Sequence, residues 1–269
     1  MKRSIGEAEA LQLIKSYAGK TILDGTEITP QEFLSQYASL PEDFSCILDD
    51  KKLYFTAEYI ESGCFVMRRC FLEEKMTEKE KRDLGLWYNA NYDPELVREI
   101  AYMNNLCFAF NQIKPSDRAK QNEILKKIFR KMGKECAVNA PFWVDYGYNT
   151  TVGDYFFANR YCQILDGAPV RFGDHVFIAP NCVFTTAEHA LIPDQRNMGL
   201  EIALPITVGN NVWFGTGVKV LGGVTIGDNC VIGAGSVVTK DIPENSLAVG
   251  VPCRVLREIT EKDRIEYIK

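Results

Sequence analysis

Residues 208–238 read VGNNVWFGTGVKVLGGVTIGDNCVIGAGSVV, and an apolar residue recurs there at every sixth position. A helix places its apolar residues three and four positions apart and a half-buried strand places them two apart, so neither fits. A period of six is typical of a parallel β-helix, in which short strands form the walls of a coil. Each coil buries its apolar residues by stacking on the next one. The apolar series is Val208, Phe214, Val220, Ile226, Ile232 and Val238.

The same period continues toward the N-terminus in two registers. They are displaced from each other by two residues, which predicts a bulge in the coil at 167–169. Between Phe184 and Val208 the repeat fails, although these residues are 24 positions apart, a whole multiple of six. The segment is too polar for the wall of a coil, so we predict an extruded loop, and such loops often carry function. The first register holds Ala140, Tyr146, Val152, Ala158 and Ile164, and the second holds Phe172, Ile178 and Phe184.

The residues before the coil lack its period of six. Those nearest to the coil carry the signals of helix starts. Asp93-Pro94-Glu95 and Ser116 are each expected to open a helix. Further upstream, Thr29-Pro30 opens a helix-like segment, and short aromatic and β-branched runs suggest a small antiparallel sheet. The predicted fold class is mainly β. Its parts are an α+β module at 1–76, a helical segment at 77–134, the β-helix at 135–258 with its loop at 185–207, and a closing helix at 259–269.

The composition excludes several classes of protein. A net charge of −5 argues against a general nucleic-acid binder. The start of the chain has no apolar core of a secretory signal, and no apolar stretch is long enough to span a membrane. Nine scattered cysteines without a CxxC pair indicate buried free thiols in a reducing compartment. We therefore expect a cytoplasmic protein that binds neither nucleic acid nor membrane.

The chain contains only two histidines, and this scarcity constrains its chemistry. His189 lies in the extruded loop beside Glu188, and an imidazole positioned there can accept and return a proton near neutral pH. His175 lies inside a hexad, FGDHVF, where polar residues point outward, so we interpret it as structural. A catalytic zinc site needs three imidazoles or equivalents, which two histidines cannot supply. We expect no metal.

Other polar residues have a structural and a functional interpretation, and spacing alone leaves both open. Asn159 and Asp166 lie on adjacent hexads. They can be interpreted as solvated corner residues or as residues that contact a ligand. Trp213 precedes the small turn Gly215-Thr216-Gly217 and suits either an acyl-thioester arm or wall packing. A basic cluster near the end of the coil can be interpreted as a binding site for cofactor phosphates or as a set of solvated charges. It consists of Lys240, Arg254 and Arg257.

From about Thr77 to Ile259 the chain resembles the maltose and galactoside O-acetyltransferases of the hexapeptide-repeat acyltransferases. The resemblance lies in YNANYDPELV at 88–97, APFWVDYGYNTTVGDYFFAN at 140–159 and VIGAGSVVTKDIPENSLAVGVPCRVLREI at 231–259. It implies a left-handed β-helix and a homotrimer with active sites between subunits. It also implies acetyl-coenzyme A (acetyl-CoA) as donor and a sugar hydroxyl as acceptor. Residues 1–76 have no counterpart in this family, and we expect them to fold as a separate unit.

The resemblance also implies roles for individual residues. His189 falls on the catalytic base and Asn159 on its polar partner. Asp145 and Asp166 fall on or beside positions that bind the acceptor, and Asn89 falls where an acidic sugar contact is usual. Trp213, Thr216, Ala234, Thr239, Lys240, Arg254 and Arg257 fall along the coenzyme A groove.

Three departures from the family concern the acceptor. They are Asn89 in place of the acid, Ile100 in place of an arginine with Arg98 nearby, and Gly167 in place of the aspartate found in galactoside enzymes. The acceptor is thus left open, and two other functions remain. An N-acetyltransferase of an amino sugar or small amine would use the same base and donor site. A non-catalytic coil serving as an assembly platform would need neither His189 nor the basic cluster.

Overall fold

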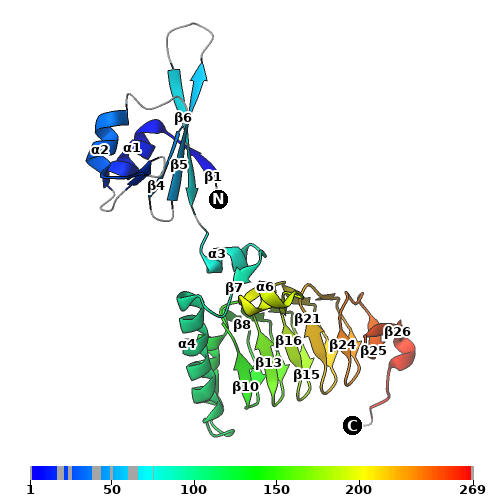
Figure 1. Ribbon diagram of the computed structural model, residues 1–269. Helices are drawn as coiled ribbons and strands as arrows, with labels where there is room; N and C mark the ends of the chain where they lie inside the picture. The colour runs from blue at the N-terminus through cyan, green and yellow to red at the C-terminus, as the bar shows by residue number, and fades with distance from the viewer. Residues whose placement is uncertain are drawn as a thin grey trace. The chain divides into compact units, whose positions relative to one another are not determined.

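The structure, a computed structural model, describes residues 2–16, 21–23, 26–37, 44–48, 51–59, 66–74 and 76–267. The chain divides into two compact units, Met1–Thr77 and Glu78–Lys269 (Figure 1). The division lies one residue beyond the boundary expected at 76. Within the described ranges, no helix combines the length and the apolar character that a membrane crossing requires.

The first unit is an antiparallel sheet with two helices. Ala10, Ile14, Phe33, Leu53 and Cys70 form its buried core. The predicted helix start at Thr29 is confirmed, since Thr29 and Glu32 cap each other's backbone N–H groups. The strand order is β1-β6-β5-β4-β2-β3, with β1 (Lys2–Ile5), β2 (Thr21–Leu23), β3 (Thr26–Ile28), β4 (Phe44–Leu48), β5 (Lys51–Tyr59), β6 (Val66–Glu74), α1 (Glu7–Ser16) and α2 (Pro30–Gln36).

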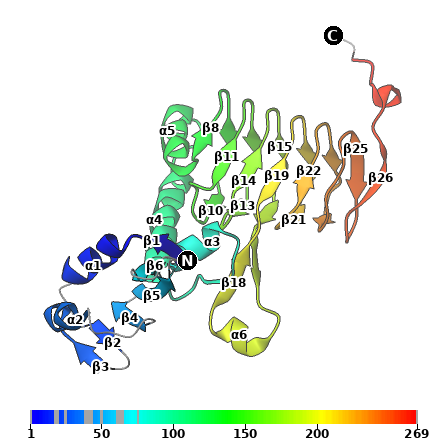
Figure 2. The ribbon, with the colours of Figure 1, turned by 90° about the horizontal axis from the view of Figure 1, so that it is seen from above.

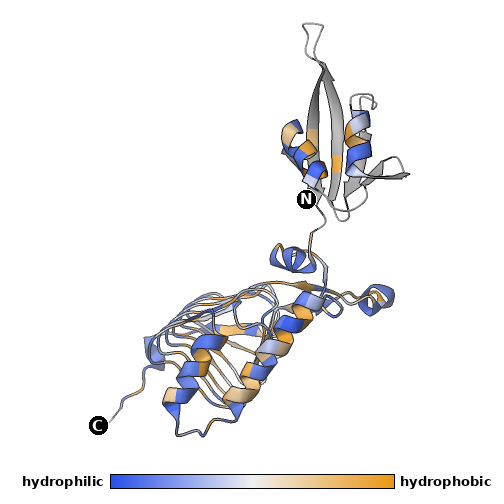
Figure 3. Cartoon of the chain, turned by 90° about the vertical axis from the view of Figure 1, so that its left-hand side faces the viewer, coloured by the Kyte–Doolittle hydropathy of each residue, from blue (hydrophilic) through white to orange (hydrophobic). Residues whose placement is uncertain are grey.

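The second unit begins with α3 (Glu78–Asp83), β7 (Tyr88–Asn89), α4 (Pro94–Asn111) and α5 (Arg118–Ile128). As predicted, Asp93 opens α4, and its carboxylate accepts bonds from the N–H groups of Glu95 and Leu96. The helix α5 is capped by Asp117, one residue after the expected Ser116. Figure 3 shows hydrophobic and hydrophilic residues on both long helices. Their apolar residues, Met103, Cys107, Phe110 and Leu125, are buried in the same core as the coil, which they cover at its first turn.

The coil has three walls, each a parallel sheet (Figure 1). We name each wall after its first strand. The β8 sheet contains β8 (Lys131–Met132), β11 (Thr150–Val152), β14 (Val170–Phe172), β19 (Ile206–Val208) and β22 (Thr225–Ile226). The β9 sheet contains β9 (Ala137–Val138), β12 (Phe157–Ala158), β15 (Phe177–Ile178), β20 (Trp213–Phe214), β23 (Val231–Ile232) and β25 (Ser246–Val249), and the antiparallel strand β26 (Arg254–Glu258) closes it. The β10 sheet contains β10 (Phe142–Val144), β13 (Cys162–Leu165), β16 (Val183–Thr185), β21 (Lys219–Leu221) and β24 (Val237–Val238).

The predicted period of six holds within the walls, and the whole apolar series from Val208 to Val238 is buried. The expected register of Ala140 and Tyr146 is wrong by two residues, because Val138 and Val144 occupy the core column instead. The coil is widened twice rather than once. Val144 and Val152 are eight positions apart, as are Ile164 and Phe172, so the early coils have 20 residues where the later ones have 18.

The ends of the coil also differ from expectation. It starts at Lys131 rather than at 135, because β8 already pairs with β11. The closing helix predicted at 259–269 is a single 3₁₀ turn, Glu261–Asp263, over the described residues to 267. Ile265 and Tyr267 are exposed, so this segment buries no apolar face that could stabilise a longer helix.

The segment expected as an extruded loop forms an ordered hairpin. It consists of β17 (Ala187–His189), α6 (Pro193–Asn197) and β18 (Leu200–Ala203), and Figure 2 shows it as a yellow arm that leaves the coil. On its other side, β18 pairs with β7. The segment that precedes the coil therefore holds β18 of the hairpin in place.

Because each unit has its own buried core, we predict that a fragment comprising Glu78–Lys269 folds alone. Its thermal unfolding, followed by circular dichroism, should be cooperative. Its midpoint should lie within about 4 °C of the corresponding transition of the full chain, the shift that about 1 kcal/mol produces at this size. A fragment that aggregates or melts without cooperativity would contradict the division.

Candidate active site

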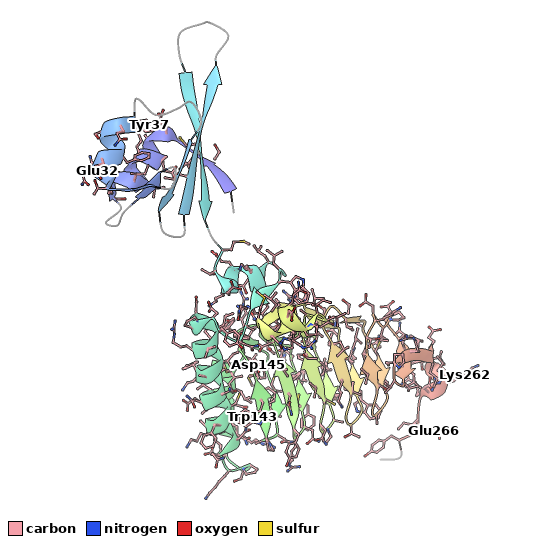
Figure 4. The ribbon with its side chains drawn as sticks, in the orientation of Figure 1. Glu32, Tyr37, Trp143, Asp145, Lys262 and Glu266 are labelled. Carbon is pink, nitrogen blue, oxygen red and sulfur yellow. The ribbon has the colours of Figure 1, made fainter. Side chains whose placement is uncertain are left out.

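A cleft of about 340 Å³ opens beside the hairpin. It lies at the edge where the chain passes from the β10 sheet to the β8 sheet, which we call the histidine edge. Figure 4 labels Asp145 on the side of the coil from which the hairpin leaves. The lining is Ala90, Asn91, Ile100, Asp145, Tyr146, Leu165, Gly167, Thr185, Ala187, His189 and Glu201.

The imidazole of His189 is held by the hairpin and about half exposed. Strands β17 and β18 pair His189 with Glu201. Nδ1 lies 3.4 Å from the carbonyl oxygen of Leu200, and Nε2 lies 3.8 Å from Oε2 of Glu201. When Nδ1 carries the proton and donates to that carbonyl, Nε2 keeps a free lone pair. The ring can therefore act as a base through Nε2.

Glu201 was missed by the sequence analysis. Its second oxygen, Oε1, accepts a hydrogen bond from the hydroxyl of Tyr88 in β7. Burial, followed by the charge of Glu201, raises the pKa of Tyr88, so this hydroxyl stays protonated and remains a donor. Tyr88 thus fixes the carboxylate beside His189. The register of the hairpin brings these residues together, and spacing along the sequence carries no signal of it.

Asp145 follows β10 and presents a carboxyl group to the cleft. Burial, with a smaller contribution from the charge of Glu201, raises the pKa of Asp145 to about 6. Among the described residues, no side chain or backbone group forms a hydrogen bond with this carboxyl group. Its oxygens are therefore available to a ligand.

Asp166, which the resemblance placed on or beside the acceptor, does not line the cleft. The residue is completely buried, and its carboxylate accepts bonds from the N–H of Tyr146 at 2.8 Å and the hydroxyl of Thr150 at 2.9 Å. Burial raises the pKa of Asp166 to about 7. Its carboxylate ties the turn at 145–149, which widens one coil, to the turn at 166–169, which widens the next.

Asn89 also lies outside the cleft. Its side-chain nitrogen donates to the carbonyl of Met198 at 2.7 Å, and its side-chain oxygen accepts from the N–H of Tyr92 at 3.0 Å. Both polar atoms of the side chain therefore have partners within the protein. Asn91 lines the cleft in its place. The other two departures, Ile100 and Gly167, both line the cleft, and Arg98, near Ile100, does not. At Gly167 an added Cβ would lie 3.1 Å from the hydroxyl oxygen of Tyr88 and from Cβ of Ala203, so this turn packs closely against the hairpin base.

Asn159 lies on a different edge, where the chain passes from the β9 sheet to the β10 sheet. We call it the asparagine edge, and Thr216 and Ala234 lie on it too, both exposed. The side chain of Asn159 contacts Asn139 at 3.4 Å and the N–H of Arg160 at 2.8 Å. Within one chain the β10 sheet separates this edge from the histidine edge. The structure therefore does not bring Asn159 and His189 together in a single chain.

The remaining residues expected along the donor are dispersed. Trp213 projects, exposed, from the outer face of the β9 sheet, and Thr239 and Lys240 follow β24 at the histidine edge, also exposed. Both arginines belong to β26. Arg254 donates to the carbonyl of Cys253, and Arg257 binds both oxygens of Asp263 at 2.8 and 2.6 Å. This hydrogen bonding lowers the pKa of Asp263 to about 2. Over the described residues, no three His, Cys, Asp or Glu side chains form a cluster suited to a metal ion.

We predict that Asp166→Ala destabilises the coil strongly and Asp166→Asn much less. Alanine leaves a buried N–H and a buried hydroxyl without a partner, at about 1–3 kcal/mol each. Asparagine can still accept from Tyr146 and donate to the hydroxyl oxygen of Thr150. Denaturant titration should show a loss of about 2–5 kcal/mol for alanine and less than half of that for asparagine. Equal losses in the two variants would show that these bonds do not stabilise the turns.

Family models and relatives agree with this architecture. Residues 83–133 match the maltose acetyltransferase hexapeptide capping motif, and residues 205–240 match the bacterial transferase hexapeptide with six repeats. These matches cover the helices α4 and α5 and the period-six stretch.

Relatives match almost over their full length. The chain is 52% identical over 188 residues to a Staphylococcus haemolyticus protein and 46% identical over 179 residues to a Saccharomyces cerevisiae protein, both named as acetyltransferases. These alignments cover 70% and 66% of this chain and 98% and 91% of the relatives.

Two solved structures are similar in fold and sequence. A maltose O-acetyltransferase from Clostridium difficile has a TM-score of 0.67 and 48% identity, with 69% of this chain and 99% of that chain covered. A galactoside acetyltransferase in complex with coenzyme A has a TM-score of 0.69 and 40% identity, with 72% and 97% covered. The resemblance drawn from the sequence is thus confirmed, and the chain belongs to the hexapeptide-repeat acetyltransferases related to the maltose and galactoside enzymes.

Proposed function

We propose that this protein transfers the acetyl group of acetyl-CoA to a hydroxyl of a sugar or sugar-like acceptor, with His189 as general base. The observation that carries the proposal is the cleft at the histidine edge. There an imidazole with a free nitrogen faces a small space bordered by the carboxyl groups of Asp145 and Glu201. Carboxylates and amides are suitable partners for the hydroxyl groups of a sugar. The solved galactoside acetyltransferase, 40% identical, contains coenzyme A, and this supports the same donor.

The reaction is a direct transfer without a covalent enzyme intermediate. Nε2 of His189 accepts the proton of the acceptor hydroxyl while the hydroxyl oxygen attacks the thioester carbonyl carbon. The carbon–sulfur bond then breaks, and the imidazolium returns the proton to the thiolate of coenzyme A. The bond from Nδ1 to the carbonyl of Leu200 keeps the ring oriented during both transfers. Glu201 stabilises the imidazolium by its charge.

The oxyanion of the tetrahedral intermediate needs donors that are free before the reaction. The N–H of Thr216 has no acceptor among the described residues, while its hydroxyl donates to the carbonyl of Pro180 at 2.9 Å. We assign this N–H to the oxyanion and the amide of Asn159 to orientation of the reacting groups. Both belong to the asparagine edge, so in this proposal they come from a neighbouring subunit.

The division of the site between two edges requires a neighbouring subunit, and we propose that the assembly is a homotrimer, as the resemblance implies. The outer face of the β9 sheet offers a surface for assembly, because Phe157, Phe177 and Trp213 stand in register across three adjacent strands. Phe177 and Trp213 are each about half exposed in the single chain. The outer face of the β8 sheet carries Thr151, Arg171 and Thr207 in the same positions. Apolar burial between subunits therefore favours the β9 sheet.

In the assembled enzyme, Trp213, Thr216 and Ala234 border the pantetheine arm of the donor. Thr239, Lys240 and Arg254 lie toward its phosphates, where charge-assisted bonds are strong. Arg257 can join them only after it releases Asp263.

A second candidate, N-acetylation of an amino sugar, is favoured by the two carboxyl groups in the cleft. They would attract an ammonium group, although the amine must lose its proton before it attacks. The test is a thiol-release screen of sugars and amino sugars with acetyl-CoA, followed by mass spectrometry and alkaline hydrolysis of the product. An ester is cleaved by mild alkali and supports the proposal, whereas an alkali-stable amide would overturn it.

We predict that His189→Ala lowers kcat by about 10²–10⁴-fold, because proton transfer by a positioned side chain contributes that much. Binding of coenzyme A, measured by calorimetry, should change little. The matched control is His175→Asn, which removes the other histidine and tolerates its positive φ of 53°. His175 stacks on Tyr155, away from the cleft, so this variant should keep the activity of the wild type. Equal losses of activity in the two variants would refute the assignment.

We further predict a pH-dependent role for Asp145. With its pKa near 6, the carboxylate is present at pH 7.5 and mostly protonated at pH 5. Asp145→Asn should lower kcat/KM for the acceptor by about 10-fold or more at pH 7.5, as expected for a lost hydrogen bond to a charged group. The ratio of wild type to variant should approach one toward pH 5, and titration of other groups cancels in this ratio. A ratio that is constant from pH 5 to 8 would show that the charge of Asp145 plays no part.

A further inference from the structure

A second cleft, of about 520 Å³, lies between α4, the end of α5 and the widened turn at 145–149. We call it the helical cleft. Phe129, Met103 and Tyr146 are almost fully buried in its wall, and Tyr102 is 63% exposed at its margin. Ile128 and Tyr148 complete the apolar part of the lining. A mostly apolar and aromatic cleft of 300–1,000 Å³ with a few charged groups is typical of a small-molecule site.

The charges around the helical cleft are not balanced. Glu99 binds Lys79 and the hydroxyl of Tyr148, and Glu95 binds Lys79 at 3.2 Å. One lysine is therefore shared by the two carboxylates, and this group of three side chains keeps one negative charge. Lys127 is paired with Glu123 at 2.9 Å on the exposed side of α5.

Two guanidinium groups remain without a partner. The side chains of Arg98 and Arg130 form no hydrogen bond or ion pair with any residue that the structure describes. Arg98 comes from α4, and Arg130 directly precedes β8, so the two approach the cleft from different elements. A planar guanidinium suits a carboxylate, sulfonate or phosphate group.

We propose that the helical cleft binds a small molecule with an aromatic or other flat apolar body and an anionic group. The body lies against Tyr102, Phe129 and Tyr148, and the anion lies at Arg98 and Arg130. This site does not depend on the proposed acetyl transfer. The cations assigned to the donor, Lys240 and Arg254, lie at the opposite end of the coil.

The helical cleft shares one wall with the active-site cleft. Tyr146 lines both, and its N–H is held by Asp166. The guanidinium of Arg82 packs over the ring of Tyr146 at 4.6 Å and fixes it further. A ligand in the helical cleft therefore contacts a residue of the acceptor site.

The test uses two fluorescent dyes of the same shape with the full-length protein. One is 1-anilinonaphthalene-8-sulfonate, which carries the anion, and the other is N-phenyl-1-naphthylamine, which lacks it. Arg98→Gln and Arg130→Gln should each weaken binding of the sulfonate about 10-fold or more, the effect of losing a bond to a charged group. Both should change binding of the neutral dye less than about twofold, and Tyr102→Ala should weaken both dyes. Arg171→Gln, an exposed arginine outside this cleft, is the matched control and should change neither.

Thermal unfolding of each variant shows that it is folded, which is expected because both arginines are exposed and unpaired. Saturable binding of the sulfonate at one site per chain, unaffected by excess coenzyme A, would support the proposal. Displacement of the dye by coenzyme A would overturn it, because the dye would then occupy the donor groove. Unchanged affinity for the sulfonate in both arginine variants would overturn it as well.

Discussion

The carboxylate of Asp166 is the constraint on which the geometry of the active-site cleft depends. The later coils of this protein have 18 residues. Two consecutive coils of this protein are instead widened to 20 residues, and the buried carboxylate joins the turn at 145–149 to the turn at 166–169. The widened turns carry Asp145 and Tyr146 to the cleft, and Gly167 leaves space for the base of the hairpin. Without this link, buried donors would lose their acceptor and the wall of the cleft would lose its support.

The hairpin adds the second part of the site by a different principle. Its strand β18 lies between β17 and β7, so one short sheet connects His189, Glu201 and Tyr88. The strand β7, which precedes the coil, thus helps to position the base, although in this proposal it contributes no group to the reaction. This arrangement agrees with the match of residues 83–133 to the capping motif of the maltose acetyltransferases.

The β-helix and the place of His189 in the hairpin could be predicted from the sequence, because both depend on local signals. The period of six, the Asp93 cap and the interruption between Phe184 and Val208 are visible without any tertiary information. The roles of Asp166, Asn89 and Glu201 could not be predicted from the sequence, because each depends on a partner far away in the chain. Asp166 and Asn89 look like exposed polar residues until the hydrogen bonds with Tyr146 and Met198 are known. The register predicted at Ala140 and Tyr146 was wrong because a two-residue insertion leaves an apparent period of six on either side of it.

In the proposed enzyme the active site is shared, with His189 from one subunit and Asn159 from its neighbour. Co-expression of His189→Ala with Asn159→Ala tests it most directly, since each variant alone should be nearly inactive. If the subunits assort at random in a trimer, about one site in four receives both intact residues. A shared site predicts that acetyl transfer by the mixture recovers to about a quarter of the wild-type rate. A mixture no more active than the mean of the two separate variants would contradict it.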